Sequence, residues 1–284
     1  MQHRGQKQVE LAVMIRHYQW ILLFLLTLLC VVATWLIDVP VGSTDTSDRH
    51  FLHLAFTESR FSYLFHHLLT VVPVALLSFE HRIHYVDRWK AVLSALSVPA
   101  LLYILWDVLF TDAGVWTFDH EKVTGFFILG LPWEEWTWFI VVPLACVFIY
   151  DNLLYYIRRD PWEGADKWVS LMIGFGSLIV ALFNMDKLYT FLAFSTAGII
   201  TLWDWYFYRP RPRTRFYMTF AVSLIPMIIF NGWLTGMFSG SPLVSYDPES
   251  FMGWRVFTMP LEDIFFGYGY LFLVIRIYQQ IVNK

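Results

Sequence analysis

The chain has 284 residues, of which 57% are hydrophobic and 19% aromatic, and its formal net charge is −3. Only 15% of its residues are charged, whereas soluble domains average about 25%. This composition excludes an ordinary soluble domain, which could not bury so much apolar surface. The near-neutral net charge by itself says nothing about nucleic acid, and we expect no nucleic-acid partner. A bilayer accommodates such a chain, so we expect membrane lipid around it.

Apolar stretches long enough to cross a bilayer recur along the chain, since a transmembrane helix needs about 20 such residues. In lipid each stretch must be helical, because every backbone N–H and C=O needs a partner within its own segment. The first stretch follows the basic residues Arg4, Lys7 and Arg16 and is too long for a cleaved signal peptide, so we interpret it as an anchor helix. The eight stretches are Tyr18–Ile37, Phe61–Phe79, Ala91–Phe110, Phe126–Tyr150, Trp168–Asn184, Leu188–Phe207, Phe216–Leu234 and Phe257–Ile277.

Basic residues alternate between the segments that connect these stretches. The N-terminus, every second loop and the C-terminal region carry 15 of the 20 Lys and Arg residues, and the other loops carry 5. Positive charge marks the cytoplasmic side of a membrane protein. The pattern therefore predicts a multi-pass protein of the cell membrane with both termini in the cytoplasm.

An internal repeat relates the two halves of the chain. Matching residues recur at an offset of 128 positions: Asp119/Asp247, Glu121/Glu249, Gly125/Gly253, Pro132/Pro260, Glu134/Glu262 and Glu135/Asp263. Upstream, Asp107–Thr111 resembles Asn231–Thr235 with a slip of four residues. Three spans in each half carry the similarity, and the single span between them makes the two units point the same way across the membrane. A site where the units meet is the natural expectation.

These patterns predict an all-α integral membrane protein of about eight transmembrane helices, with two parallel-oriented three-helix repeats plus the extra first and fifth spans. We divide it into an N-terminal region (1–60), a first repeat (61–157), a linking helix (158–187) and a second repeat (188–284).

Paired carboxylates follow a proline near the start of the fourth and eighth stretches, as Glu134-Glu135 and Glu262-Asp263. We expect each pair about 10–13 Å inside its span, where ionised groups cost about 2.5–3.5 kcal/mol each. Adjacent helical residues diverge by about 100°, so one acid of each pair should face the interior. The other would pair with Arg255, bind a helix N-terminus or face water.

Such acids are candidates for proton transfer, because a carboxyl group in an apolar pocket is an acid while it holds its proton and a base afterwards. Aromatic faces near them could stabilise a carbocation that water cannot reach. The aromatic candidates are Trp116, Trp133, Trp136, Trp138, Phe139, Phe265 and Phe266. Asp119 and Asp247 are typical of helix caps, and Asp247-Pro248-Glu249 predicts a helix start. A simpler interpretation is that the four acids only lock helices together.

Linked motifs over about residues 61–280 resemble the non-flavoprotein, heterodimer-type lycopene cyclases, here with both units fused in one chain. The segments that carry the resemblance are Ser62–Leu64, Leu77–Glu80, Leu105–Thr111, Val115–Asp119, Thr124–Gly125, Leu131–Trp136 and Pro143–Tyr150 in the first unit, and Asn231–Gly236, Tyr246–Asp247, Arg255 and Met259–Gly267 in the second.

The resemblance implies an intramolecular lyase or isomerase that cyclises the ψ-ends of lycopene to β-carotene through γ-carotene. It implies no cofactor and no metal, a lipid-dissolved carotenoid substrate, and other enzymes of carotenoid synthesis as possible partners. Glu134, Glu135, Glu262 and Asp263 would supply the acid and the base. The supporting residues would be Asp107, Asp119, Asn231, Asp247 and Arg255.

Two other classes of protein share some of these features. A proton-coupled transporter would also combine repeats, proline-containing helices and intramembrane carboxylates. A non-catalytic protein that assembles pigment-synthesis enzymes would need the acids only as structural contacts.

Overall fold

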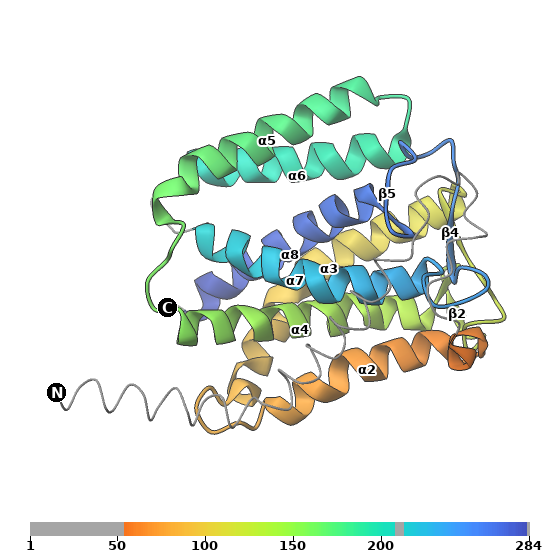
Figure 1. Ribbon diagram of the computed structural model, residues 1–284, viewed down its shortest axis with the longest axis horizontal. Helices are drawn as coiled ribbons and strands as arrows, with labels where there is room; N and C mark the ends of the chain where they lie inside the picture. The colour runs from red at the N-terminus through yellow and green to blue at the C-terminus, as the bar shows by residue number, and fades with distance from the viewer. Residues whose placement is uncertain (1–53, 208–212, 283–284) are drawn as a thin grey trace, which may run out of the picture. The chain divides into compact units, whose positions relative to one another are not determined.

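The computed structural model describes residues 54–207 and 213–282, which form a bundle of seven α-helices (Figure 1). The predicted first span, Tyr18–Ile37, lies outside the described residues. Short 3₁₀ turns at Ala55–Glu58, Tyr85–Arg88 and Glu163–Ala165 precede α2, α3 and α5. The helices are α2 (Ser62–Leu77), α3 (Trp89–Asp112), α4 (Trp133–Tyr156), α5 (Asp166–Phe183), α6 (Leu188–Phe207), α7 (Thr214–Leu234) and α8 (Leu261–Val282).

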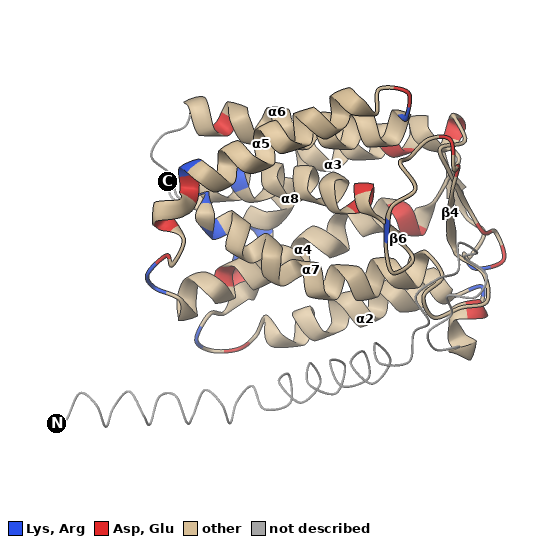
Figure 2. Cartoon of the chain, turned by 45° about the horizontal axis from the view of Figure 1, so that its top comes forward, with Lys and Arg blue, Asp and Glu red and all other residues tan. Residues whose placement is uncertain are grey.

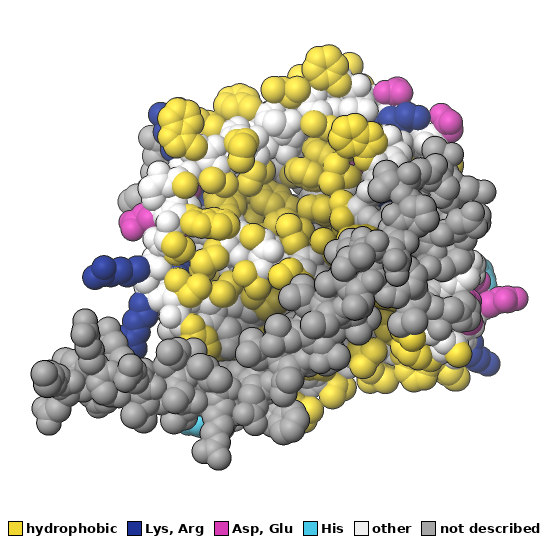
Figure 3. Space-filling view, in the orientation of Figure 1, with side chains coloured by type: hydrophobic (Ala, Val, Ile, Leu, Met, Phe, Trp, Pro, Cys, Tyr) yellow, Lys and Arg dark blue, Asp and Glu magenta, His cyan; other side chains and the backbone are white. Residues whose placement is uncertain are grey.

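Five helical segments in the described part are long and apolar enough to cross a membrane. Their bounds are Tyr85–Asp112, Trp133–Tyr156, Glu163–Phe183, Thr214–Leu234 and Leu261–Val282. Charged residues concentrate toward the two ends of the helices (Figure 2), and hydrophobic side chains spread over the visible face (Figure 3). The chain is therefore a multi-pass membrane protein, while the count of about eight spans stays a prediction.

Three two-stranded antiparallel sheets lie at one end of the bundle (Figure 1). The apolar stretches from Phe126 and from Phe257 predict helix where the β2–β3 sheet and part of the β5–β6 sheet lie, but α4 and α8 begin only at Trp133 and Leu261. Leu129 (φ 51°) and Phe257 (φ 57°) are left-handed and cannot continue a right-handed helix. The paired sheets are β1 (Trp116–Phe118) with β4 (Val244–Tyr246), β2 (Phe127–Ile128) with β3 (Leu131–Pro132), and β5 (Arg255–Val256) with β6 (Met259–Pro260).

Because α4 and α8 begin later than predicted, the paired acids lie closer to the start of their helices than expected. They occupy the first turn of α4 and α8, directly after a short hairpin, rather than a position two turns inside a longer helix. Each hairpin ends on a proline, Pro132 or Pro260. Pro132 takes the N-cap position of α4 with extended backbone (ψ 142°), and proline is compatible with a helix start because that position needs no intrahelical N–H bond.

The internal repeat is visible as a near two-fold relation between α2–α4 and α6–α8. β1 and β4 are the corresponding strands of the two units and pair with each other around Thr117 and Ser245. The flanking bonds are reciprocal: Asp119 donates its N–H to Leu243 (2.8 Å), and Asp247 donates to Val115 (2.9 Å). Both α4 and α8 begin at the strand end of the bundle (Figure 1), so the predicted parallel repeat is confirmed.

A buried ion network joins the helices at the end away from the strands. Asp204 of α6 contacts the guanidinium groups of Arg213 (3.2 Å) and Arg276 (2.7 Å). Arg213 also pairs with Asp166 at the start of α5 (2.5 Å). Because Asp204, Arg213 and Arg276 are all buried, each needs its partners to offset the loss of hydration. The network ties α5 and α6 to α7 and α8.

We therefore expect Asp204→Ala to lower the free energy of unfolding by about 3–5 kcal/mol, because it leaves two buried guanidinium groups without a shared partner. Thermal unfolding of the purified protein in detergent measures the change. Asp186→Ala, at an exposed position between α5 and α6, is the matched control and should leave the transition unchanged. Equal stability of the two variants would contradict the assigned role.

Candidate active site

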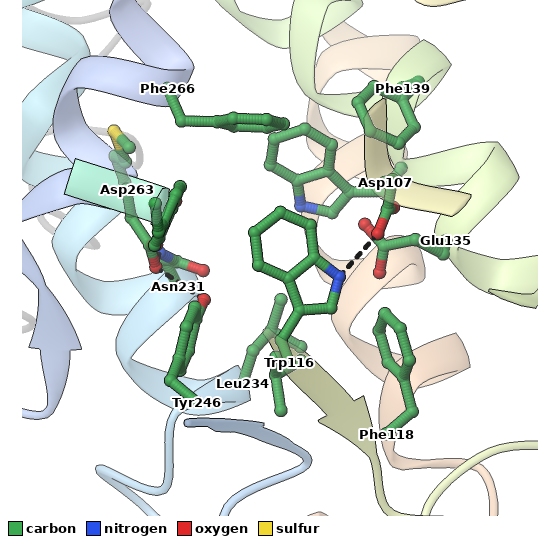
Figure 4. Close-up of a pocket in the computed structure, with 14 residues that line it drawn as sticks. Asp107, Trp116, Phe118, Glu135, Phe139, Asn231, Leu234, Tyr246, Asp263 and Phe266 are labelled. Atoms are coloured by element: carbon green, nitrogen blue, oxygen red, sulfur yellow. Dashed lines mark hydrogen bonds between the residues drawn. The ribbon is translucent and has the colours of Figure 1, made fainter. Parts of the chain in front are cut away.

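A cavity lies between the two units at the strand end of the bundle. Its volume is about 60 Å³, several times the about 10–15 Å³ that one water molecule needs. Both units contribute to its wall, as Figure 4 shows for the labelled side chains. The lining residues are Asp107, Trp116, Phe118, Glu135, Trp138, Phe139, Tyr189, Met227, Asn231, Leu234, Val244, Tyr246, Asp263 and Phe266.

One acid of each pair lines this cavity, Glu135 from α4 and Asp263 from α8. Their neighbours Glu134 and Glu262 point elsewhere, as the angular step between successive helical residues requires. All four are buried, and Glu134 and Glu262 have no exposed surface at all. The expectation that one acid of each pair would face the interior is met, but the neighbouring acids do not face water.

Glu134 and Glu262 instead bind the turn that precedes their own helix. The Oε1 atom of Glu134 accepts the N–H of Thr124 (2.8 Å), and that of Glu262 accepts the N–H of Met252 (3.0 Å). Glu262 also accepts the hydroxyl of Thr190 on α6 (2.5 Å). Thr124 and Met252 are 128 residues apart, so this contact is duplicated. Each acid thus anchors a turn to the first residues of its helix.

In the second unit, three hydrogen-bond donors surround Asp263. Tyr189 of α6 donates to Oδ1 (2.6 Å), while Asn231 of α7 (2.6 Å) and Tyr246 of β4 (2.8 Å) donate to Oδ2. Burial, and next the charge of Asp263, raises the pKa of Tyr246 well above its ordinary value. The Tyr246 hydroxyl therefore keeps its proton and acts as a donor.

In the first unit, Glu135 occupies the equivalent place. Tyr63 of α2 donates a hydrogen bond from its hydroxyl to Glu135, and the carboxyl groups of Glu135 and Asp107 lie beside each other in the cavity wall (Figure 4). Asp107 accepts the indole N–H of Trp116 (2.7 Å), the bond drawn in Figure 4. Trp116 lies between the two acid clusters in that view.

The aromatic candidates divide into two groups. Trp116, Trp138, Phe139 and Phe266 line the cavity. The other three lie elsewhere: Trp133 donates to Thr124 (2.6 Å), Trp136 donates to the Ile128 carbonyl (3.2 Å), and Phe265 stacks on Phe194 with ring centroids 3.9 Å apart.

The remaining polar candidates shape the turns around the site. Asp119 accepts the N–H of Glu121 (2.9 Å), and Asp247 accepts that of Glu249 (3.3 Å). The predicted helix start at Asp247 is wrong, because a turn leads into β5 there. Arg255 donates to the Thr258 carbonyl within the β5–β6 hairpin (2.5 Å). No group of three or more His, Cys, Asp or Glu side chains in the described ranges is placed to hold a metal ion.

Tyr63, Tyr189 and Tyr246 contact the cavity acids but are not among the site residues predicted from the sequence. Tyr63 and Tyr189 sit near the start of α2 and α6, 126 positions apart and only two short of the repeat offset. Pairing the polar aromatic residues across the repeat would have found them. Read singly, each is typical of the aromatic belt at a membrane interface.

The fold and the site define a membrane protein in which two similar helical units share one cavity lined by carboxyl and aromatic groups. The family model described as lycopene cyclase matches the chain twice, over residues 60–153 and 186–281, once in each unit. No curated protein and no solved structure matches the chain. The chain belongs to the lycopene cyclase family, in a form with both units fused, and is an enzyme of carotenoid cyclisation.

The anchoring contacts lead to a stability prediction. Glu134→Ala removes the acceptor of the Thr124 N–H and should lower the free energy of unfolding by about 1–3 kcal/mol. Glu134→Gln keeps an acceptor oxygen at the same place and should lose much less. Thermal unfolding of both variants in the same detergent makes the comparison. A loss as large in Glu134→Gln as in Glu134→Ala would mean that the backbone contact is not what stabilises this turn.

Proposed function

We propose that this protein is a lycopene β-cyclase in which Glu135 and Asp263 form the acid–base pair of a proton-initiated, non-redox cyclisation. The observation that carries the proposal is that two buried carboxyl groups, one from each unit, face the same aromatic-lined cavity. A reaction that adds one proton and removes another needs one donor and one acceptor within reach of one substrate end.

The proposed reaction begins with protonation of the terminal 1,2 double bond of a ψ-end. The 5,6 double bond attacks the resulting cation and closes a six-membered ring. A base then removes a ring proton and leaves the β-end group. One proton is gained and one lost, so the product is an isomer of the substrate, and no oxidant or reductant enters the balance. This places the enzyme among the intramolecular lyases and isomerases.

The aromatic wall supports the cationic stage of this reaction. Trp116 and Phe266 lie with ring centroids 6.1 Å apart, and Trp138 and Phe139 lie 5.1 Å apart. The face of an aromatic ring attracts a nearby cation, most strongly where water is excluded. Indole and phenyl rings also offer no nucleophile that would capture the cation as readily as water would.

In this proposal Glu134 and Glu262 have a positioning role. Each holds the turn before its helix, and Glu135 and Asp263 are their direct neighbours in sequence. A turn fixed in this way fixes the first helical residue and so the direction in which the cavity acid points. We propose that Glu134 and Glu262 serve the proton transfer by this anchoring, and that Arg255, Asp119 and Asp247 shape the same turns.

Lycopene has two ψ-ends and dissolves in the bilayer. We therefore expect two successive cyclisations, with the substrate entering from the lipid. Because both acids face one cavity, a molecule presents one end at a time. The first cyclisation then yields γ-carotene and the second β-carotene, with entry from the lipid between helices. The distribution of basic residues supports a place in the cell membrane with both termini cytoplasmic. Enzymes that supply or consume these lipid-dissolved carotenoids are the expected partners.

Expression of the chain in lycopene-accumulating cells should convert lycopene to β-carotene, with γ-carotene appearing first, as measured by chromatography. Glu135→Gln and Asp263→Asn should each lower conversion by about 100-fold or more, the usual loss for a general acid or base. Asp112→Asn removes an acid from an exposed position at the end of α3 and should convert lycopene normally. Full conversion by both cavity variants, at equal membrane levels, would refute the assignment.

A further inference from the structure

The two units differ at several corresponding positions beside the cavity acids, and one of these differences exchanges a carboxyl group for an amide. α3 carries Asp107, whose carboxyl group lies beside that of Glu135 in the cavity wall (Figure 4), and α7 carries Asn231, which donates to Asp263 (2.6 Å). Asp107 and Asn231 begin the two segments that resemble each other across the repeat. A carboxyl group in one unit is thus replaced by an amide in the other, next to the acid that each unit presents to the cavity.

The environment of Asp263 is that of a carboxylate. Its three partners are the hydroxyls of Tyr189 and Tyr246 and the amide N–H of Asn231. Each partner points a hydrogen at an Asp263 oxygen, and an ionised carboxylate accepts at both oxygens while donating nothing. Charge-assisted bonds of this kind are about twice as strong as neutral ones. The second unit therefore holds its cavity acid ready to accept a proton.

The environment of Glu135 requires a proton. Glu135 and Asp107 are neighbouring buried carboxyl groups, and ionising both at once is costly because their like charges repel. Between turnovers the Glu135–Asp107 pair therefore holds one proton. The other partners, Tyr63 on Glu135 and Trp116 on Asp107, are donors and supply none of it. The first unit thus stores one transferable proton beside the cavity.

We propose that Glu135, carrying the proton that it shares with Asp107, is the acid of the cyclisation, and that Asp263, held by Tyr189, Tyr246 and Asn231, is the base. This division rests on the proposed function. Asp107 and Asn231 are positioning residues, since each acts through the neighbouring acid. The near two-fold site thereby becomes directional through a carboxyl at position 107 and an amide at position 231.

The proton balance of one turnover follows from this division. The shared proton bonds to C2 of the ψ-end and leaves Glu135 and Asp107 both ionised. The 5,6 double bond closes the ring on C1, and Asp263 takes the proton from C6, which restores a double bond between C5 and C6. The proton on Asp263 returns to the Glu135–Asp107 pair when the product leaves and water enters the cavity. No other reactant is required.

Deuterium from the solvent tests the division directly. Purified protein in detergent made with D₂O should form β-carotene that carries one deuterium at C2 for each ring closed. In Asp263→Asn the acid Glu135 is intact, so we expect deuterium to enter the lycopene that is recovered. Any ring that does close should carry its double bond at a position other than C5–C6. In Glu135→Gln no deuterium should enter the carotenoid and no rings should close. Product masses and fragment positions are read by mass spectrometry.

The positioning residues are tested in the same assay. Asp107→Asn should lower deuterium uptake and ring formation by about 100-fold, with Asp107→Glu restoring part of both. Asn231→Ala should leave deuterium uptake into lycopene intact and slow ring completion. Thermal unfolding of each variant, with Asp112→Asn as the control, separates these effects from loss of the fold.

The possible failures are distinguishable. If deuterium enters carotenoid in Glu135→Gln and not in Asp263→Asn, the acid and base are reversed and our division is overturned. The same deuterium pattern in both variants would also overturn it, while leaving the pair itself in place. If neither variant alters turnover, the proposed function fails at these residues, and the division fails with it.

Discussion

Burial of four carboxyl groups inside an apolar helical bundle is the constraint on which the site end of this protein depends. Each group must be given hydrogen-bond donors, because water is not there to solvate it. Backbone N–H groups of Thr124 and Met252 serve one acid of each pair, and Tyr63, Tyr189 and Tyr246 serve the acids of the cavity. The turns at Thr124 and Met252, which precede the hairpins before α4 and α8, supply the backbone donors to Glu134 and Glu262.

Duplication explains how two such acids come to face one cavity. In each unit the helix that carries the acid pair begins at the same end of the bundle, and β1 pairs with β4 across the near two-fold relation. A single unit would present one acid to an open groove, whereas two units enclose a space between them. In the mechanism that we propose, differences between the copies set the direction of proton transfer, since an identical pair would give the proton no preferred direction.

The sequence predicted the parts of this structure that depend on local or periodic signals. Apolar length located the described helices, the offset of 128 residues located the repeat, and the helical step predicted that one acid of each pair would face inward. The hairpins escaped because Leu129 and Phe257 adopt left-handed backbone despite ordinary helical preferences. Tyr63 and Tyr189 were missed because their contacts join α2 to α4 and α6 to α8, over 72 and 74 residues of chain.

The cyclisation that we propose places two opposing demands on the cavity. Carbocation chemistry requires that water be absent, because water would capture the cation and give an alcohol. Proton return between turnovers requires that water or another carrier be present. A cavity with room for water when empty, and with Trp116 and Phe266 in its wall, reconciles these demands if the substrate end itself displaces the water. In this proposal the bound substrate end reacts and also excludes water from the cavity. The acids then exchange protons with water only after the product has left.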